Sequence, residues 1–237
     1  MKKFSDKKVH VMKITWLGQA GLLFEGDGKK ILIDPYLSDN FKNLEPQNYR
    51  RVPVDERFLS IKPDVIVVTH NHLDHLDKET LKYYLTEDAE ALVLAPNGGW
   101  QELRKFGGKS NYVLFNAGTE WSCGNVRFTA VKAEHSDPCA IGVIVSAEGR
   151  DYYVTGDTLY NEAVFASLPK KDFYAVFLPV NGKGNNMNMT DAARFAARTG
   201  AKYAVPFHIG MFDNLGPSDF AAENRVIPKI WKEIVFQ

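Results

Sequence analysis

The residues with the clearest chemical potential lie in one short segment, Thr69-His70-Asn71-His72-Leu73-Asp74-His75. The chain has only six histidines in 237 residues, so this spacing would arise by chance in roughly two or three chains per ten thousand. Imidazole and carboxylate ligands suit zinc, manganese or iron, and the lack of cysteine in the segment argues against a soft-metal site. A solvated polar loop that binds no metal is the alternative interpretation.

The position of this segment supports a metal site. It follows the β-branched run 64–69, which is typical of a strand buried on both faces. Side chains at the carboxyl end of such a strand project into a crevice. His70 and His72 lie on the same side of an extended chain, and the turn that follows brings Asp74 and His75 round to a second point. One loop can therefore offer two pairs of ligands.

Three further donors, His135, Asp157 and His208, also follow predicted strands, and among the six histidines only His10 lies outside this set. Each of the three has an ordinary interpretation when taken alone. Either histidine could be a turn or core residue, and Asp157 could cap the helix that follows it. Asp34 either caps a turn before a proline or orients a metal ligand from behind.

The elements that must position these donors form two groups of strands with helices in each half, which predicts two sheets packed face to face with helices outside. The predicted strands are 11–16, 21–24, 30–34, 64–69, 91–95, 112–115, 126–133, 140–146, 151–155, 174–179 and 203–206, and the predicted helices are 78–85, 100–106, 161–168 and 190–200. Residues 37–53 are expected to form a long loop. With no repeat or linker, residues 1–237 are interpreted as a single domain.

Composition narrows the classes of partner. Lys+Arg and Asp+Glu both number 29, so the chain lacks the basic excess that steers most nucleic-acid binders to phosphates. Two cysteines do not make a disulfide framework. The basic start is not followed by an apolar signal region, and no apolar run is long enough to cross a bilayer. We therefore expect a soluble cytoplasmic protein that acts on a small molecule, with homo-oligomerisation left open.

The seven donors His70, His72, Asp74, His75, His135, Asp157 and His208 together resemble the motif set of the metallo-β-lactamase fold superfamily, over nearly the whole chain. The segments 156–160, 178–182, 188–190 and 206–208 are similar to the L-ascorbate-6-phosphate lactonase-like group, although the chain lacks the long insertions of the sugar-phosphate enzyme. The resemblance implies an α+β fold with four αββα layers and two mixed sheets.

The resemblance also implies roles for these residues. One metal would be held by His70, His72 and His135, and the other by Asp74, His75 and His208. Asp157 would bridge the two metals, and Asp34 would support the histidine loop. Asp74, Asp157 and His208 are the catalytic candidates.

Two divalent ions, zinc or manganese with iron as a further candidate, would supply hydrolytic chemistry. Ions about 3.5–4 Å apart can share one hydroxide and lower the pKa of that water towards about 7. The hydroxide attacks a carbonyl or phosphoryl centre, and a metal stabilises the resulting oxyanion. Asp74 could be a ligand, a proton acceptor, or both.

Candidate substrate contacts lie in the run 181–186, where backbone N–H groups and one positive charge could meet an anion. The alternative is a flexible connector before the next helix. The substrate-binding candidates are Asn181, Lys183, Asn185, Thr158 and Tyr160, whereas Tyr36 and Phe212 either line the pocket or simply pack.

These observations favour a hydrolase of small anionic metabolites, with a lactone or ester of a sugar phosphate as the leading substrate. The alternative is a phosphodiesterase or nuclease that uses the same two metals, although balanced charge and the lack of an RNA-gripping insertion count against it. A non-catalytic metal-binding scaffold or iron redox module is the third hypothesis.

Overall fold

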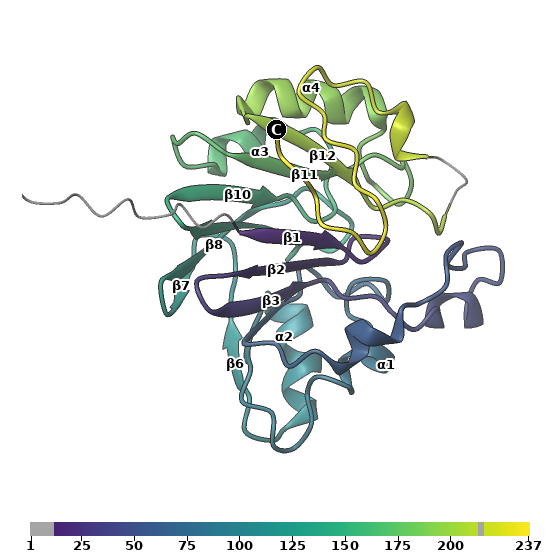
Figure 1. The fold of residues 1–237 in the computed structure, drawn as a ribbon, viewed down its shortest axis with the longest axis vertical. Coiled ribbons are helices and arrows are strands. Elements are labelled where there is room, and N and C mark those ends of the chain that lie inside the picture. The colour runs from purple at the N-terminus through teal and green to yellow at the C-terminus, as the bar shows by residue number, and fades with distance from the viewer. Residues whose placement is uncertain (1–11, 213–215) are drawn as a thin grey trace, which may run out of the picture.

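Two six-stranded sheets form the centre of the protein (Figure 1). The structure is a computed structural model, and it describes residues 12–212 and 216–237. The first sheet contains, in spatial order, β1 (Lys13–Trp16), β2 (Leu22–Gly26), β3 (Lys29–Ile33), β4 (Val65–Val67), β5 (Leu92–Ala95) and β6 (Asn111–Leu114). The second contains β12 (Tyr203–Phe207), β11 (Ala175–Pro179), β10 (Arg150–Val154), β9 (Ile141–Ala147), β8 (Val126–Lys132) and β7 (Glu120–Cys123).

Both sheets are mixed, as the resemblance implied. β1, β2 and β3 pair antiparallel, and β3 to β6 pair parallel. In the second sheet β7 to β10 pair antiparallel, and β10, β11 and β12 pair parallel. The β2–β3 hairpin turns at Asp27 and Gly28, which have φ of 50° and 69°. An Asp-Gly pair suits this two-residue turn because both positions need positive φ.

Helices cover the outer face of each sheet, so the prediction of two sheets with helices outside is confirmed (Figure 1). α1 and α2 lie beside the first sheet, and α3 and α4 lie beside the second. Their bounds are Lys78–Leu81 for α1, Asn97–Leu103 for α2, Glu162–Ser167 for α3 and Met189–Thr199 for α4, with short 3-10 helices at Asn40–Asn43, Glu56–Ser60, Arg104–Phe106 and Pro217–Asp219.

Apolar side chains from both sheets form the main core. Phe24 of β2 makes edge contacts with Tyr152 of β10 and Phe177 of β11, with ring centroids 5.9 and 5.7 Å apart. A second cluster lies between the first sheet and its helices and includes Ile66, Val93 and Leu81. β4 is buried along its whole length, as expected for a strand covered on both faces, although it spans only Val65–Val67 of the predicted strand 64–69. This packing fixes the strand ends that carry the site.

The structure differs from the sequence-based expectations in a few elements. Strand β7 was not predicted, because its four residues include Glu120 and Ser122 and mostly face solvent at a sheet edge. Helix α1 stops at Leu81 instead of residue 85, and tighter turns follow it. Helix α2 begins at Asn97, three residues before the predicted start. The predicted first strand began at residue 11, which lies outside the described residues, as does His10.

The structure also bears on two further expectations, which concern the state of the cysteines and the presence of a membrane-spanning helix. Cys123 and Cys139 are both free thiols. Within the described ranges, every helix is too short or too polar to cross a bilayer.

Candidate metal centre

Seven donor side chains that are far apart in sequence meet at one end of the two sheets. These side chains form three groups, and within each group the potential ligand atoms lie within 4.8 Å of one another. The groups are His70 with His72 and His135, His70 with His75 and Asp157, and Asp74 with His75 and His208. The first and third groups are the two ligand triads that the sequence resemblance implied. The second group contains Asp157 and one histidine from each of the two triads.

Strand ends from both sheets carry these donors. The 70–75 loop follows β4 in the first sheet, whereas His135, Asp157 and His208 follow β8, β10 and β12 in the second. A backbone hydrogen bond from Ile141 N to Thr69 O, 3.0 Å long, joins the two sheets beside the site. Gly156 has φ of 60°, and a Cβ there would lie 2.6 Å from Ile141 O. The backbone before Asp157 therefore fits against the histidine loop only with glycine at position 156.

The first triad is arranged around His70. Nε2 of His135 lies 3.1 Å from Nδ1 of His72. The ring of His70 is centred 4.5 Å from that of His72 and 4.8 Å from that of His135. Nε2 of His70 is buried and has no hydrogen-bond partner among the described residues.

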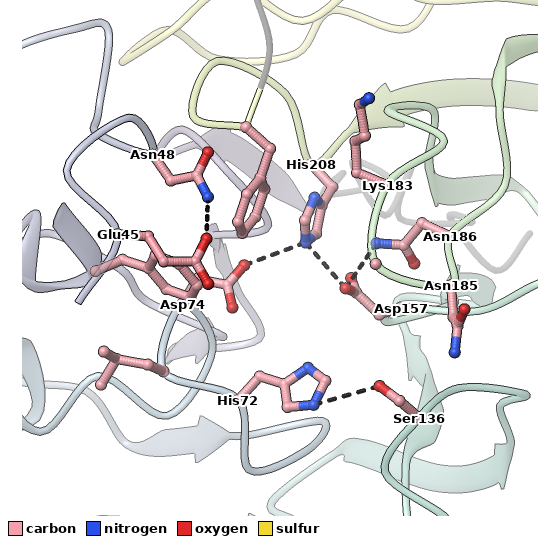
Figure 2. Close-up of a pocket in the computed structure, with 14 residues that line it drawn as sticks. Glu45, Asn48, His72, Asp74, Ser136, Asp157, Lys183, Asn185, Asn186 and His208 are labelled. Atoms are coloured by element: carbon pink, nitrogen blue, oxygen red, sulfur yellow. Dashed lines mark hydrogen bonds and ion pairs between the residues drawn. The ribbon is translucent and has the colours of Figure 1, made fainter.

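The second triad is equally compact. Nε2 of His75 lies 3.2 Å from Nε2 of His208. Oδ2 of Asp74 lies 3.4 Å from Nε2 of His208 and 3.7 Å from Nε2 of His75. Figure 2 shows the Asp74 carboxylate directed at the ring of His208, and both residues line the pocket that opens onto these atoms.

Asp157 lies between the two triads. Its Oδ2 is 3.0 Å from Nε2 of His208 and 3.7 Å from Nε2 of His135. Its Oδ1 is 3.2 Å from Nε2 of His75 but is oriented so that it makes no hydrogen bond. One carboxylate therefore faces histidines of both triads, which is the arrangement that a bridging ligand needs.

The donors fit a pair of divalent cations. In each triad two imidazole nitrogens lie only 3.1–3.2 Å apart, and His70 Nε2 has no hydrogen-bond partner among the described residues. Buried polar atoms without partners are rare in folded proteins because their desolvation is costly. Nitrogen and oxygen donors without sulfur suit zinc, manganese or iron.

Asp34 holds the histidine loop from behind. Its Oδ2 accepts a hydrogen bond from Nδ1 of His75 at 2.8 Å and another from Thr69 Oγ1 at 2.6 Å. Its Oδ1 accepts from Thr69 N at 2.7 Å. With the proton fixed on Nδ1, Nε2 of His75 presents its lone pair to the site, which is the usual effect of a carboxylate behind a ligand histidine.

Three side chains that sequence reasoning did not assign to the ligand shell also contact the donors. Asn186 Nδ2 donates to Asp157 Oδ2 at 2.7 Å, and Gln19 Nε2 donates to Asp74 Oδ2 at 2.7 Å. Ser136 Oγ lies 3.4 Å from His72 Nε2. Asn181, a predicted substrate contact, instead lies with its side-chain amide 2.9 Å from His208 Nδ1. It therefore orients a histidine that is a candidate metal ligand.

Charge in the site is arranged to attract cations. Burial disfavours protonation of His208, but Asp157 and Asp74 outweigh it and raise its pKa to about 9. The pKa of His75 is likewise raised well above its usual value, because Asp157, Asp34 and Asp74 outweigh its burial. Burial and the neighbouring His75 keep the pKa of His70 well below its usual value. The buried carboxylates therefore stabilise positive charge in the site, either as protons on the histidines or as bound cations.

Metal binding should release protons and strengthen with pH. The pKa of His208, raised to about 9, means that this imidazole holds a proton at neutral pH in the metal-free protein, which a cation must displace. The raised pKa of His75 acts in the same direction. We expect at least about one proton to be released at pH 7 and the affinity to rise by about tenfold or more per pH unit up to about pH 9. Calorimetric titration with Zn²⁺ in buffers of different ionisation enthalpy measures both. Proton-independent binding at pH 7 would contradict the assignment.

A pocket of about 620 Å³ opens onto the two triads (Figure 2). It is lined by Phe41, Glu45, Asn48, His72, Leu73, Asp74, Ser136, Asp157, Lys183, Gly184, Asn185, Asn186, His208 and Phe212. Lys183 and Asn185 are therefore placed beside the metal centre. Phe212 is a wall of the pocket, whereas Tyr36 is fully buried.

Thr158 and Tyr160 lie away from the described lining of this pocket. Thr158 is buried, and its Oγ1 accepts from Glu134 N at 2.9 Å. Tyr160 packs against Phe165 and lies under Arg194, outside the second sheet. The geometry therefore does not support a substrate contact by Thr158 or by Tyr160.

Comparison with known proteins identifies the family. Residues 29–209 match the family model described as a β-lactamase superfamily domain. The chain belongs to the metallo-β-lactamase superfamily of metal-dependent hydrolases. A UPF0173 metal-dependent hydrolase of Sulfurisphaera tokodaii is 30% identical, and the alignment covers 95% of this chain and 96% of the relative.

Solved structures show the same fold for this hydrolase. Igni18, a metallo hydrolase from Ignicoccus hospitalis, superposes with a TM-score of 0.74 at 21% identity, covering 95% of this chain and 98% of its own. An isothiocyanate hydrolase from Delia radicum gut bacteria superposes with a TM-score of 0.73 at 21% identity, covering 95% of this chain and 99% of its own. At these identities the likeness supports the fold alone.

Proposed function

We propose that this hydrolase holds two divalent cations, zinc or manganese by preference, and cleaves an ester or lactone bond in a small anionic metabolite such as a sugar phosphate. The convergence of seven nitrogen and oxygen donors in two triads that share Asp157 carries the proposal. When bound, such a pair of cations lowers the pKa of a shared water and stabilises the oxyanion formed on the substrate.

The chain's own residues would orient and deprotonate the attacking water. Asp157 and Asp74 both line the pocket, so their carboxylates reach the space where substrate and water meet. Asp74 is the proposed proton acceptor, because it faces the pocket and lies 3.4 Å from Nε2 of His208. Asn186 and Asn181 hold Asp157 and His208 in place through their side-chain amides.

The electrostatics of the pocket support an anionic substrate. The carboxylates of Asp74, Asp157 and Asp34 carry three negative charges against the four of two divalent cations, so the loaded centre would keep about one positive charge. Lys183, the only lysine or arginine in the described lining of the pocket, has no carboxylate within ion-pair distance among the described residues. Its ammonium group is therefore available to a substrate anion.

The loop that carries Lys183 is attached to the metal centre. His135 Nδ1 lies 3.2 Å from the backbone carbonyl oxygen of Asn185, which accepts its proton. Gly182 and Gly184 take φ of 64° and 59° around Lys183, and Asn181 reaches His208. These contacts favour a binding loop over a mere connector. A single pocket lysine also offers little to the many phosphates of a nucleic acid, which weighs against the nuclease alternative.

A substrate screen with a charge variant tests the proposal. Purified protein loaded with Zn²⁺ or Mn²⁺ is assayed on sugar-phosphate lactones, neutral esters, phosphodiesters and an isothiocyanate. We expect Lys183→Gln to raise KM about tenfold for the anionic substrates, since a charge-assisted hydrogen bond contributes about 1.5–3 kcal/mol. KM for neutral esters should change little.

Lys62→Gln is the matched control, because it removes the same charge from an exposed lysine that does not line the pocket. The proposal fails if no ester or lactone is turned over above the level of the metal-free protein, or if a phosphodiester is the preferred substrate.

A further inference from the structure

Gln19 is a buried amide that no catalytic or ligand role yet explains. It lies in the tight loop after β1 and is only 3% exposed. Its backbone adopts the left-handed region, with φ of 50°, which is uncommon for a residue other than glycine. A residue kept in this conformation, with a polar side chain out of water, must be held there by specific contacts.

Contacts from two directions hold the backbone of Gln19. Its carbonyl oxygen accepts one hydrogen bond from Trp16 Nε1 and another from His208 N, each 2.9 Å long. The second of these links the loop after β1 directly to the loop that carries a predicted metal ligand. The Gln19 side chain therefore has a fixed starting point relative to His208.

The side chain reaches two ligands of the second triad. Nε2 of Gln19 lies 2.7 Å from Asp74 Oδ2 and 3.2 and 3.4 Å from the two ring nitrogens of His208. A donor directed at one imidazole lone pair approaches that nitrogen alone, so the nearly equal distances to His208 indicate packing against the ring. The contact with Asp74 is the hydrogen bond, and its length is that of a charge-assisted bond.

Distance also decides whether Gln19 is itself a ligand. Two ligand atoms at right angles on one zinc or manganese ion, each about 2.0–2.2 Å from it, lie about 3 Å apart. The 2.7 Å contact between Gln19 and Asp74 is shorter than that and matches hydrogen bonding. Turning the amide to present Oε1 would place two unprotonated oxygens against each other. Gln19 therefore donates to Asp74.

We infer that Gln19 is a positioning residue for the second metal: by donating to Asp74 Oδ2 and packing on His208, it fixes two of the three ligands in that triad. This inference rests on the proposed two-cation site. It assigns the first triad no dependence on Gln19, because the hydrogen-bonding contacts of the Gln19 side chain among the described residues are with Asp74 and His208.

Metal titration of Gln19 variants tests this assignment without using activity. Gln19→Met keeps the length of the side chain and removes the donor, whereas Gln19→His keeps an N–H donor. Stepwise Mn²⁺ binding is followed by electron paramagnetic resonance, in which a second ion converts the signal of an isolated ion into that of a coupled pair. A His208→Ala variant shows the signal of a protein without the second site.

The ratio of the second to the first dissociation constant is the measured quantity. We expect Gln19→Met to raise this ratio 10–100-fold, the usual cost of losing a group that orients a ligand, and Gln19→His to leave it within about threefold. An unchanged ratio in Gln19→Met, or an equal rise in both variants, would overturn the inference. Loss of the fold would also raise the first dissociation constant, so a first-site affinity equal to that of the wild type shows that the ratio reports on the second site alone.

Failure of the inference and failure of the proposed function give different results. If the ratio rises in Gln19→Met but no ester or lactone is cleaved, the metal assignment stands and the substrate proposal falls. If wild-type protein cleaves an ester or lactone while the ratio is insensitive to Gln19, the proposed function stands and the positioning role of Gln19 falls.

Discussion

Replacing Asp157 with alanine should lower kcat by on the order of 10³-fold, which corresponds to about 4 kcal/mol of transition-state stabilisation. Asp157 faces histidines of both triads, so its loss removes the group that couples the two cations. It also leaves the buried His75 and His208 without the carboxylate that does most to raise their pKa values. Steady-state assays with the best substrate, together with the number of metals bound, measure the effect.

Asp151→Ala is the matched control for this substitution. Asp151 lies on β10, the strand that leads to Asp157, but it pairs with Lys171 and Ser146 at the far end of that strand. It should leave kcat within about twofold and the metal count unchanged. Full activity of the Asp157→Ala protein with both metals retained would show that Asp157 is neither a metal ligand nor a catalytic residue.

Removing the metals should destabilise the protein strongly. A ligand present at 1,000 times its dissociation constant stabilises the folded state by about 4.1 kcal/mol per site, so two sites contribute about 8 kcal/mol. For a chain of this size each kcal/mol shifts Tm by about 2–4 °C, so we expect chelation to lower Tm by roughly 15–30 °C. Calorimetric scans with and without EDTA measure the shift.

A variant with both His70 and His208 changed to alanine provides the reference for chelation. Each triad then lacks one imidazole, so EDTA should shift its Tm by less than about 5 °C. A large shift in this variant would show that EDTA acts at some other site. A negligible shift in the wild-type protein would show that the centre binds no metal under these conditions.

The part of the site that could be predicted from sequence is the part encoded by local spacing. His70, His72, Asp74 and His75 follow one buried strand within six positions, so a single loop fixes their relation. His135, Asp157 and His208 could be added because each follows a predicted strand. Their convergence depends on which strand ends share one edge, and for that the family resemblance was needed.

Gln19, Asn186 and Ser136 could not be predicted in the same way. An amide or hydroxyl is common in loops, and its role depends on which buried group it meets after folding. The only hint at Gln19 was its place in the Leu17-Gly18-Gln19-Ala20-Gly21 loop, where a polar side chain sits among small residues and leucine. Its contact with Asp74 spans 55 positions of sequence.

The pocket walls escaped prediction for a related reason. Phe41, Glu45 and Asn48 come from the long irregular loop 37–53, which has no periodicity to indicate its path. Tyr160 was suggested by its closeness in sequence to Asp157, but the chain turns after Thr158 and carries the ring to the outer surface of the second sheet. Adjacency in sequence does not determine the side of a sheet once a strand has ended.

The two sides of the pocket should tolerate amino-acid substitution to different degrees. The donors stand on strand ends anchored in the shared core, where Gly156 has no room for even a methyl group. The walls opposite them come from loops, where Glu45 and Lys183 are exposed and Asn48 is half-buried and donates a hydrogen bond to Glu45. Mutation can therefore alter which molecules are admitted while the reactive machinery is inherited intact, so close relatives of this chain should share their metal dependence more faithfully than their substrates.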